Sequence, residues 1–98
     1  MNEGVDIAAF MERVRWDPRI GPLHISLYAA ILYYWVAQGK PERVTVMGKE
    51  LMPFAKIAGG TPFYRCLKQL HAYGYIVYEP SFNPAVKSGI ALVVGDHK

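Results

Sequence analysis

One short stretch of this 98-residue chain combines side chains that bind phosphates and bases. Between residues 61 and 73, the exposed positions of an expected helix carry Tyr64, Arg65 and Lys68. Arginine pairs with guanine or phosphate, lysine pairs with phosphate, and tyrosine contacts a base or sugar. This face is therefore a candidate nucleic-acid contact. The alternative interpretation is that Arg65 and Lys68 are ordinary solvated residues and that Tyr64 covers apolar surface.

Residues around this helix extend the candidate site. Thr61 and its flanking amides are placed to hold a phosphate at the helix N-terminus, and the adjoining glycines let a ligand approach the backbone. Two lysines at the ends of the preceding helix and the loop 79–89 supply further contacts, although a lysine in a long loop also serves solubility. The complete set of expected contact residues is Lys49, Lys56, Gly60, Thr61, Tyr64, Arg65, Lys68, Asn83 and Lys87.

The residue types required for catalysis are scattered. His24, His71 and His97 lie in three distant segments without metal-ligand spacing. Cys66 falls on the expected buried stripe, where an inert thiol is the favoured interpretation. Gly59-Gly60 lacks the Gly-Lys-Ser/Thr that follows in a phosphate loop. We therefore expect no enzyme, no cofactor and no metal site.

Charge is distributed unevenly along the chain, whose formal net charge is +3. Residues 1–38 carry three arginines against four acidic residues, which gives −1. Residues 39–98 carry eight Lys or Arg against four acidic residues, which gives +4. With 52% hydrophobic and 19% charged residues, the composition favours a packed core over disorder. An acidic partner should therefore meet the C-terminal two-thirds.

Three features predict a cytoplasmic protein without membrane contact. A single cysteine, Cys66, excludes an intramolecular disulfide and fits a reducing compartment. The acidic N-terminal residues lack the pattern of a signal peptide. The longest apolar run, Ile25–Ala37, has 13 residues, whereas a membrane span needs about 20.

Two helices are predicted in the first 38 residues. Apolar residues at i, i+3, i+4 and i+7 predict an amphipathic helix from about residue 6 to residue 16. Gly21 and Pro22 fit the N-cap and first position of a second helix, which Gly39 ends as a left-handed residue. The apolar stripe of the first helix is Ile7, Phe10, Met11 and Val14.

The second helix is apolar on nearly every face over His24–Gln38, so it lies either inside the domain or under a partner. Core is the commoner outcome for such a helix. A homodimer formed through the N-terminal and second helices is the alternative.

The remaining chain predicts short elements around one longer helix. Val44–Val46 reads as a strand and Gly48–Ala55 as a short helix that contains Pro53. The helix 61–73 begins at Thr61 as its N-cap, with Gly59 as the alternative cap. Its predicted core stripe is Phe63, Cys66, Leu67 and Leu70.

Two strands follow, Tyr75–Tyr78 and Ile90–Val94, with Gly74 as the preceding helix stop. They are joined by the loop 79–89, whose prolines and glycine are typical of a long hairpin tip. The predicted fold class is mainly α with a small β-hairpin, and the order of elements is that of a winged helix-turn-helix.

Several segments resemble one family of small bacterial winged-helix proteins over roughly residues 17–94. The relatives have a serine where Met47 stands and a polar cap with a basic residue at Gly59-Gly60, and they lack Pro53. The segments that carry the resemblance are His24–Tyr28, Lys49–Met52, Ala55–Ile57, Arg65–Leu70, Gly74–Ile76, Tyr78–Ser81 and Asn83-Pro84.

Members of this family are regarded as DNA-binding regulators, some of them carried on mobile or conjugative elements. The resemblance implies a sequence-specific, double-stranded DNA-binding protein active in transcription regulation. In this arrangement the helix 61–73 enters the major groove and the loop 79–89 lies on the adjacent backbone or minor groove. The alternative is a winged-helix protein–protein interaction module without direct DNA binding.

Overall fold

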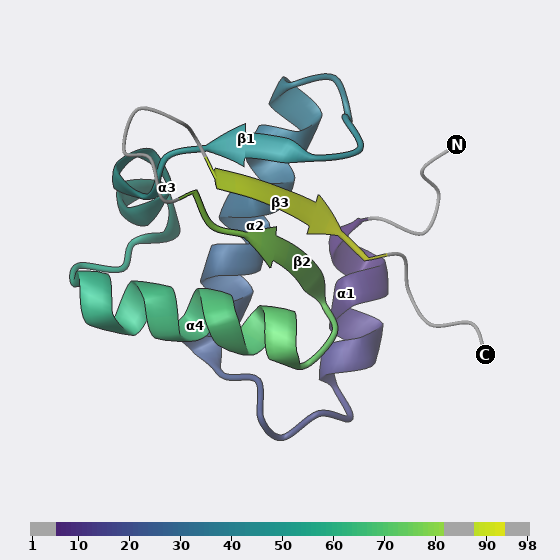
Figure 1. Cartoon of the computed structure of the whole chain (residues 1–98). Helices are drawn as coiled ribbons and strands as arrows, with labels where there is room; N and C mark the ends of the chain where they lie inside the picture. The colour runs from purple at the N-terminus through teal and green to yellow at the C-terminus, as the bar shows by residue number, and fades with distance from the viewer. Residues whose placement is uncertain (1–5, 82–87, 94–98) are drawn as a thin grey trace.

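A computed structural model of the chain describes residues 6–81 and 88–93 (Figure 1). These residues form an α+β fold with four helices and a three-stranded antiparallel sheet. The α+β class expected from the sequence is thereby confirmed. In chain order the elements are α1 (Ile7–Val14), α2 (Pro22–Ala37), β1 (Val44–Val46), α3 (Gly48–Ala55), α4 (Gly60–Ala72), β2 (Ile76–Glu79) and β3 (Ser88–Leu92).

The sheet has the strand order β1-β3-β2, so the last strand lies in the middle. Ile90 of β3 pairs with Val44 on one side and with Tyr78 on the other. Val44, Ile90 and Ile76 are buried, because this face of the sheet packs toward the helices. The sequence predicted the hairpin, and the structure adds β1 as its third strand.

Both hairpin strands begin one or two residues away from their predicted positions. Tyr75 was expected in the first strand, but its N–H donates to the carbonyl of Leu70 at 2.9 Å and closes the end of α4. The strand β2 therefore starts at Ile76. The loop tip, with the expected contacts Asn83 and Lys87, lies outside the described residues.

The free edge of β1 is covered by a side chain. The amide of Gln38 accepts from the N–H of Thr45 at 3.2 Å and donates to the carbonyl of Thr45 at 2.9 Å. The Gln38 amide thus occupies the N–H and carbonyl of Thr45 that a neighbouring strand would bond, and it blocks further edge pairing at this residue.

Three helix ends lie at the glycine and proline residues where the sequence predicts them. Gly21 and Pro22 begin α2, and Gly39 (φ 85°) and Gly74 (φ 87°) take the left-handed conformation after α2 and α4. The helix α1 is shorter than predicted because Asp17 donates its N–H to the carbonyl of Val14 at 2.9 Å, which turns the chain.

The predicted start of α4 is wrong by two residues. Gly59, the alternative, is the N-cap: it is extended, and its carbonyl accepts from the N–H of Phe63 at 3.1 Å. Thr61 and Pro62 therefore lie inside the first turn. Pro62 is tolerated there because the first amides of a helix have no partner within it.

The core is built around α2. Leu27 and Ile31 are fully buried, together with Phe63 and Leu70 of α4. Over the described ranges, no helix combines the length and apolar composition that crossing a bilayer requires.

The helix α1 buries only half of its predicted stripe. Phe10 and Val14 are buried, whereas Ile7 and Met11 are exposed, which corrects the expectation for those two residues. Phe10 stacks on Tyr28 with ring centroids 3.8 Å apart. This stacking attaches α1 to α2 through large side chains rather than through a continuous stripe.

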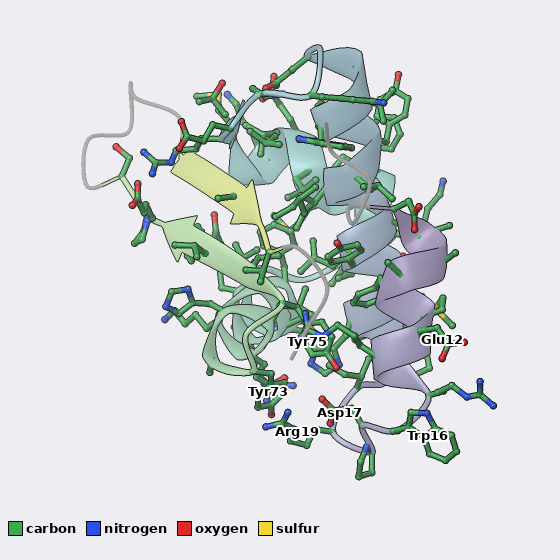
Figure 2. The ribbon with its side chains drawn as sticks, turned by 90° about the vertical axis from the view of Figure 1, so that its right-hand side faces the viewer. Glu12, Trp16, Asp17, Arg19, Tyr73 and Tyr75 are labelled. Carbon is green, nitrogen blue, oxygen red and sulfur yellow. The ribbon has the colours of Figure 1, made fainter. Side chains whose placement is uncertain are left out.

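A polar network joins the segment between α1 and α2 to the end of α4 (Figure 2). Asp17 accepts from the Nε and Nη2 of Arg19 and from the hydroxyl of Tyr75, each at 2.8 Å. The guanidinium of Arg19 lies 4.1 Å from the ring centroid of Tyr73. The hydrogen bonds from Arg19 hold the pKa of Asp17 well below its ordinary value. Burial, followed by the bond to Asp17, raises the pKa of Tyr75 to about 12.

Asp17→Asn should lower the melting temperature at neutral pH, because the carboxylate accepts bonds from two residues. A carboxyl whose pKa is lowered by folding stabilises above its unfolded pKa of about 3.9, and this contribution is lost as pH falls toward the folded value. The difference between wild type and variant should therefore shrink on acidification. Circular-dichroism melts at several pH values test this, with Glu12→Gln, in an exposed pair with Arg15, as the control. Equal melting temperatures of wild type and Asp17→Asn at neutral pH would contradict it.

Candidate nucleic-acid interface

The helix α4 separates its apolar and polar sides as predicted. Phe63, Cys66, Leu67 and Leu70 are all buried, which confirms the predicted stripe. Burial raises the pKa of the Cys66 thiol, so the thiolate needed for nucleophilic chemistry is disfavoured. With these side chains anchored inward, the opposite side of α4 faces solvent.

Five of the nine expected contact residues surround one open hollow on this solvent side. It encloses about 690 Å³ and follows the first two turns and more of α4. An arginine and a lysine at its wall place two positive charges on the same surface as the helix N-terminus. The lining residues are Gly60, Thr61, Tyr64, Arg65 and Lys68.

Tyr64 stands at the border between this hollow and the core. Its ring meets the ring of Phe63 edge-on, with centroids 4.8 Å apart, and the side chain remains 40% exposed. Its hydroxyl lies so close to Gly48 that a Cβ there would overlap it. The ring thus covers apolar surface, as in the alternative interpretation, while part of it still faces the hollow.

The two lysines of the α3 region, Lys49 and Lys56, lie at opposite ends of that helix. Lys49 is exposed in the first turn of α3, next in sequence to Gly48, and does not line the α4 hollow. Lys56 ends α3 in the left-handed conformation (φ 61°) and lines a separate hollow with Pro53 and Phe54. The structure therefore places Lys56 outside the α4 hollow.

The start of α3 has one of the two hydrogen bonds of a capping box. Glu50 Oε1 accepts from the N–H of Met47 at 3.0 Å, but Met47 has no hydroxyl to return the bond. Pro53 lies inside α3 and removes the amide that would bond the carbonyl of Lys49. Despite this loss, α3 continues to Ala55, as predicted.

Basic side chains fall into two classes among the described residues. Five are held by a carboxylate, a backbone carbonyl or an aromatic ring: Arg13, Arg15, Arg19, Lys40 and Arg43. Four have no such contact with any described residue, and all of them belong to α3, its C-cap or α4. These four are Lys49, Lys56, Arg65 and Lys68.

One arrangement at the base of the hairpin was not predicted. Arg43 Nη1 lies 3.1 Å from Glu79 Oε1, and the arginine stem crosses over Gly89 of β3. A Cβ at Gly89 would overlap this stem. The sequence predicts Gly89 in the loop 79–89, whereas the structure places it inside β3, where a glycine indicates close approach by another group. Its partner depends on strand register, which the sequence does not specify.

The described histidines have structural hydrogen bonds. His24 Nδ1 accepts from the N–H of Gly21 at 2.9 Å, so Nε2 carries the proton and donates to Gln69 Oε1 at 2.7 Å. His71 Nδ1 accepts from the N–H of Tyr78 at 3.0 Å. In the part of the chain that the structure describes, no three His, Cys, Asp or Glu residues are grouped to hold a metal ion.

Comparison with protein-family models, curated proteins and solved structures gave no match.

The effect of Gly48→Ala on the free energy of unfolding should depend on whether Tyr64 is present or replaced by alanine. With Tyr64→Ala, the substitution should stabilise the fold by about 0.4–1 kcal/mol, because alanine loses less backbone entropy on folding. With Tyr64 present, the new Cβ must displace the phenol, so this gain should be cancelled or reversed. Urea denaturation of the four proteins of this double-mutant cycle measures the coupling. An equal effect in both backgrounds would show that Tyr64 does not lie against Gly48.

Proposed function

We propose that this chain is a sequence-specific, double-stranded DNA-binding protein that regulates transcription, built as a winged helix-turn-helix. Two helices in succession, α3 and α4, are followed by the hairpin β2–β3. A recognition helix and a wing occupy these places in that fold. The strand β1 pairs with β3 and completes the small sheet.

The observation that carries the proposal is the location of the four basic side chains that have no carboxylate, carbonyl or ring contact among the described residues. A carboxylate neutralises a paired arginine locally, and a carbonyl or ring contact holds a basic side chain within the fold, whereas a side chain without such contacts is free to bind phosphate. All four free groups lie on α3, its C-cap or α4, and two of them, Arg65 and Lys68, border one hollow. DNA-binding surfaces have this combination of a helix and unpaired positive charge.

The dimensions of α4 suit a major groove. Its 13 residues give a length of about 20 Å, and the groove is about 12 Å wide and accepts one helix. Arg65 lies in the second turn, within the N-terminal half of α4 from which recognition helices reach base edges, and Lys68 lies one turn later. In Figure 1 the end of β2 and the start of β3 lie on the same side as the start of α4. In a winged helix-turn-helix the wing lies on the DNA beside the recognition helix.

Loss of the α4 charges should weaken duplex binding. If the side chain contacts a base, we expect Arg65→Ala or Lys68→Ala to weaken the free energy of DNA binding by about 1–3 kcal/mol. If the side chain contacts the DNA backbone, we expect the slope of log affinity against log salt concentration to fall by about one. Fluorescence anisotropy at several salt concentrations distinguishes these cases. Arg15→Ala is the matched control, because Arg15 is already paired with Glu12 on α1.

Sequence specificity is tested by selection from a random duplex pool with the purified wild-type protein. Enrichment of one sequence motif would support a regulator that recognises an operator. Absence of binding to any duplex at low salt would overturn the proposal and leave a protein–protein interaction module as the function. The exposed aromatic residues of α2 and α3 are the observation that favours that second candidate.

A further inference from the structure

The outer side of α2 is an exposed helix face without charge. No Asp, Glu, Lys or Arg occurs anywhere in Pro22–Ala37. Leu27 and Ile31 point into the core, and the other side of the helix exposes Ala29, Tyr33 (53%) and Val36 (55%). Exposed helix faces ordinarily carry charged residues, so this one has the composition of an interface.

The helix α3 continues this face with a third aromatic ring. Phe54 is 48% exposed and stacks on Tyr33, with ring centroids 4.7 Å apart and planes inclined by 24°. The edge of the Phe54 ring also meets Tyr34 at 5.3 Å. We call this surface the aromatic face; it consists of Ala29, Tyr33, Tyr34, Val36, Pro53 and Phe54.

The aromatic face is preorganised for contact. The three rings touch one another, so their side chains lose little freedom when a partner covers them. A hollow of about 420 Å³ beside Phe54, lined also by Pro53 and Lys56, provides a recess for an apolar side chain.

The aromatic face exposes as much apolar area as the largest patch on a typical monomer. Aromatic side chains have areas of about 150–250 Å², so the half-exposed rings and their aliphatic neighbours offer on the order of 500 Å². That equals the largest apolar patch on a typical monomer, about 300–600 Å². A standard interface buries about 800 Å² on each partner, so the aromatic face with a polar rim fits one interface of that class.

We infer that the aromatic face is the contact between two copies of this chain. A twofold axis places the same residues opposite one another, so a charged surface would repel its own copy. The face between Ala29 and Phe54 consists of apolar side chains and tyrosines and avoids this repulsion. Lys56, which also lines the hollow beside Phe54, is exposed, so water screens its charge.

The proposed contact leaves the polar side of α4 free. The buried side of α2 faces the core that contains α4, and the aromatic face lies on its other side. Figure 2 shows the sheet and the two helices α1 and α2 on different sides of the molecule. A dimer through the aromatic face would therefore present two copies of the α4 hollow. This consequence for DNA rests on the proposed function, but the dimer itself does not.

Sedimentation equilibrium of the full chain, from low micromolar to submillimolar concentration, tests the inference. Wild type should pass from monomer to dimer over this range. Val36→Lys places like charges across the twofold axis near the C-terminus of α2, where a lysine suits the helix dipole. It should weaken the dimer by at least about tenfold in Kd, which is 1.4 kcal/mol. The matched control is Val77→Lys, an exposed apolar residue of β2 that should leave the dimer unchanged.

Two further measurements separate the alternatives. Far-UV circular dichroism must show that Val36→Lys is folded. If Val36→Lys loses stability, Phe54→Ala serves as the second variant, and it should also weaken the dimer. Because the contact is apolar, raising salt should not dissociate the dimer, whereas it should weaken DNA binding. A wild type that stays monomeric overturns the inference, and so does a dimer that survives both substitutions or dissociates in salt. None of these results depends on whether the chain binds DNA.

Discussion

The packing of α4 against α2 is the contact on which the other features depend. Phe63 and Leu70 on one helix and Leu27 and Ile31 on the other are fully buried. With four apolar side chains of α4 anchored inward, the rotation of that helix about its axis is determined. The side of α4 that carries Tyr64, Arg65 and Lys68 must then face solvent. The rotation of α4 thus decides which of its side chains a ligand can reach.

Basic side chains in different parts of the fold have different surroundings. Arginines near the N-terminus are held by carboxylates and aromatic rings, as Arg19 is by Asp17 and Tyr73. These contacts fasten the chain between α1 and α2 to the end of α4. The basic residues of α3 and α4 have no comparable partners among the described residues, so their charge remains available to a ligand. The basic residues thus fall into one group with structural contacts and one group without them.

Local physical rules predicted most of the elements. Gly21 with Pro22, and the left-handed glycines Gly39 and Gly74, mark helix ends because their backbone preferences act within a few residues. The stripe on α4 was correct because a long amphipathic pattern has one stable orientation against a core. The start of α4 was wrong because Thr61 and Gly59 are both acceptable caps by local preference, and the structure uses Gly59.

The sequence alone therefore determined the α+β class, the order of the elements and which side of α4 is buried, since these follow from periodicity and turn residues close together in the chain. Only the tertiary structure decided that Ile7 and Met11 stay exposed, that Tyr64 lies on Gly48, and that Arg43 crosses Gly89 to reach Glu79. It also joined Tyr33 to Phe54 on one surface. Each of these contacts joins segments distant in the chain, and their relative position is set by helix packing and strand register rather than by local preference.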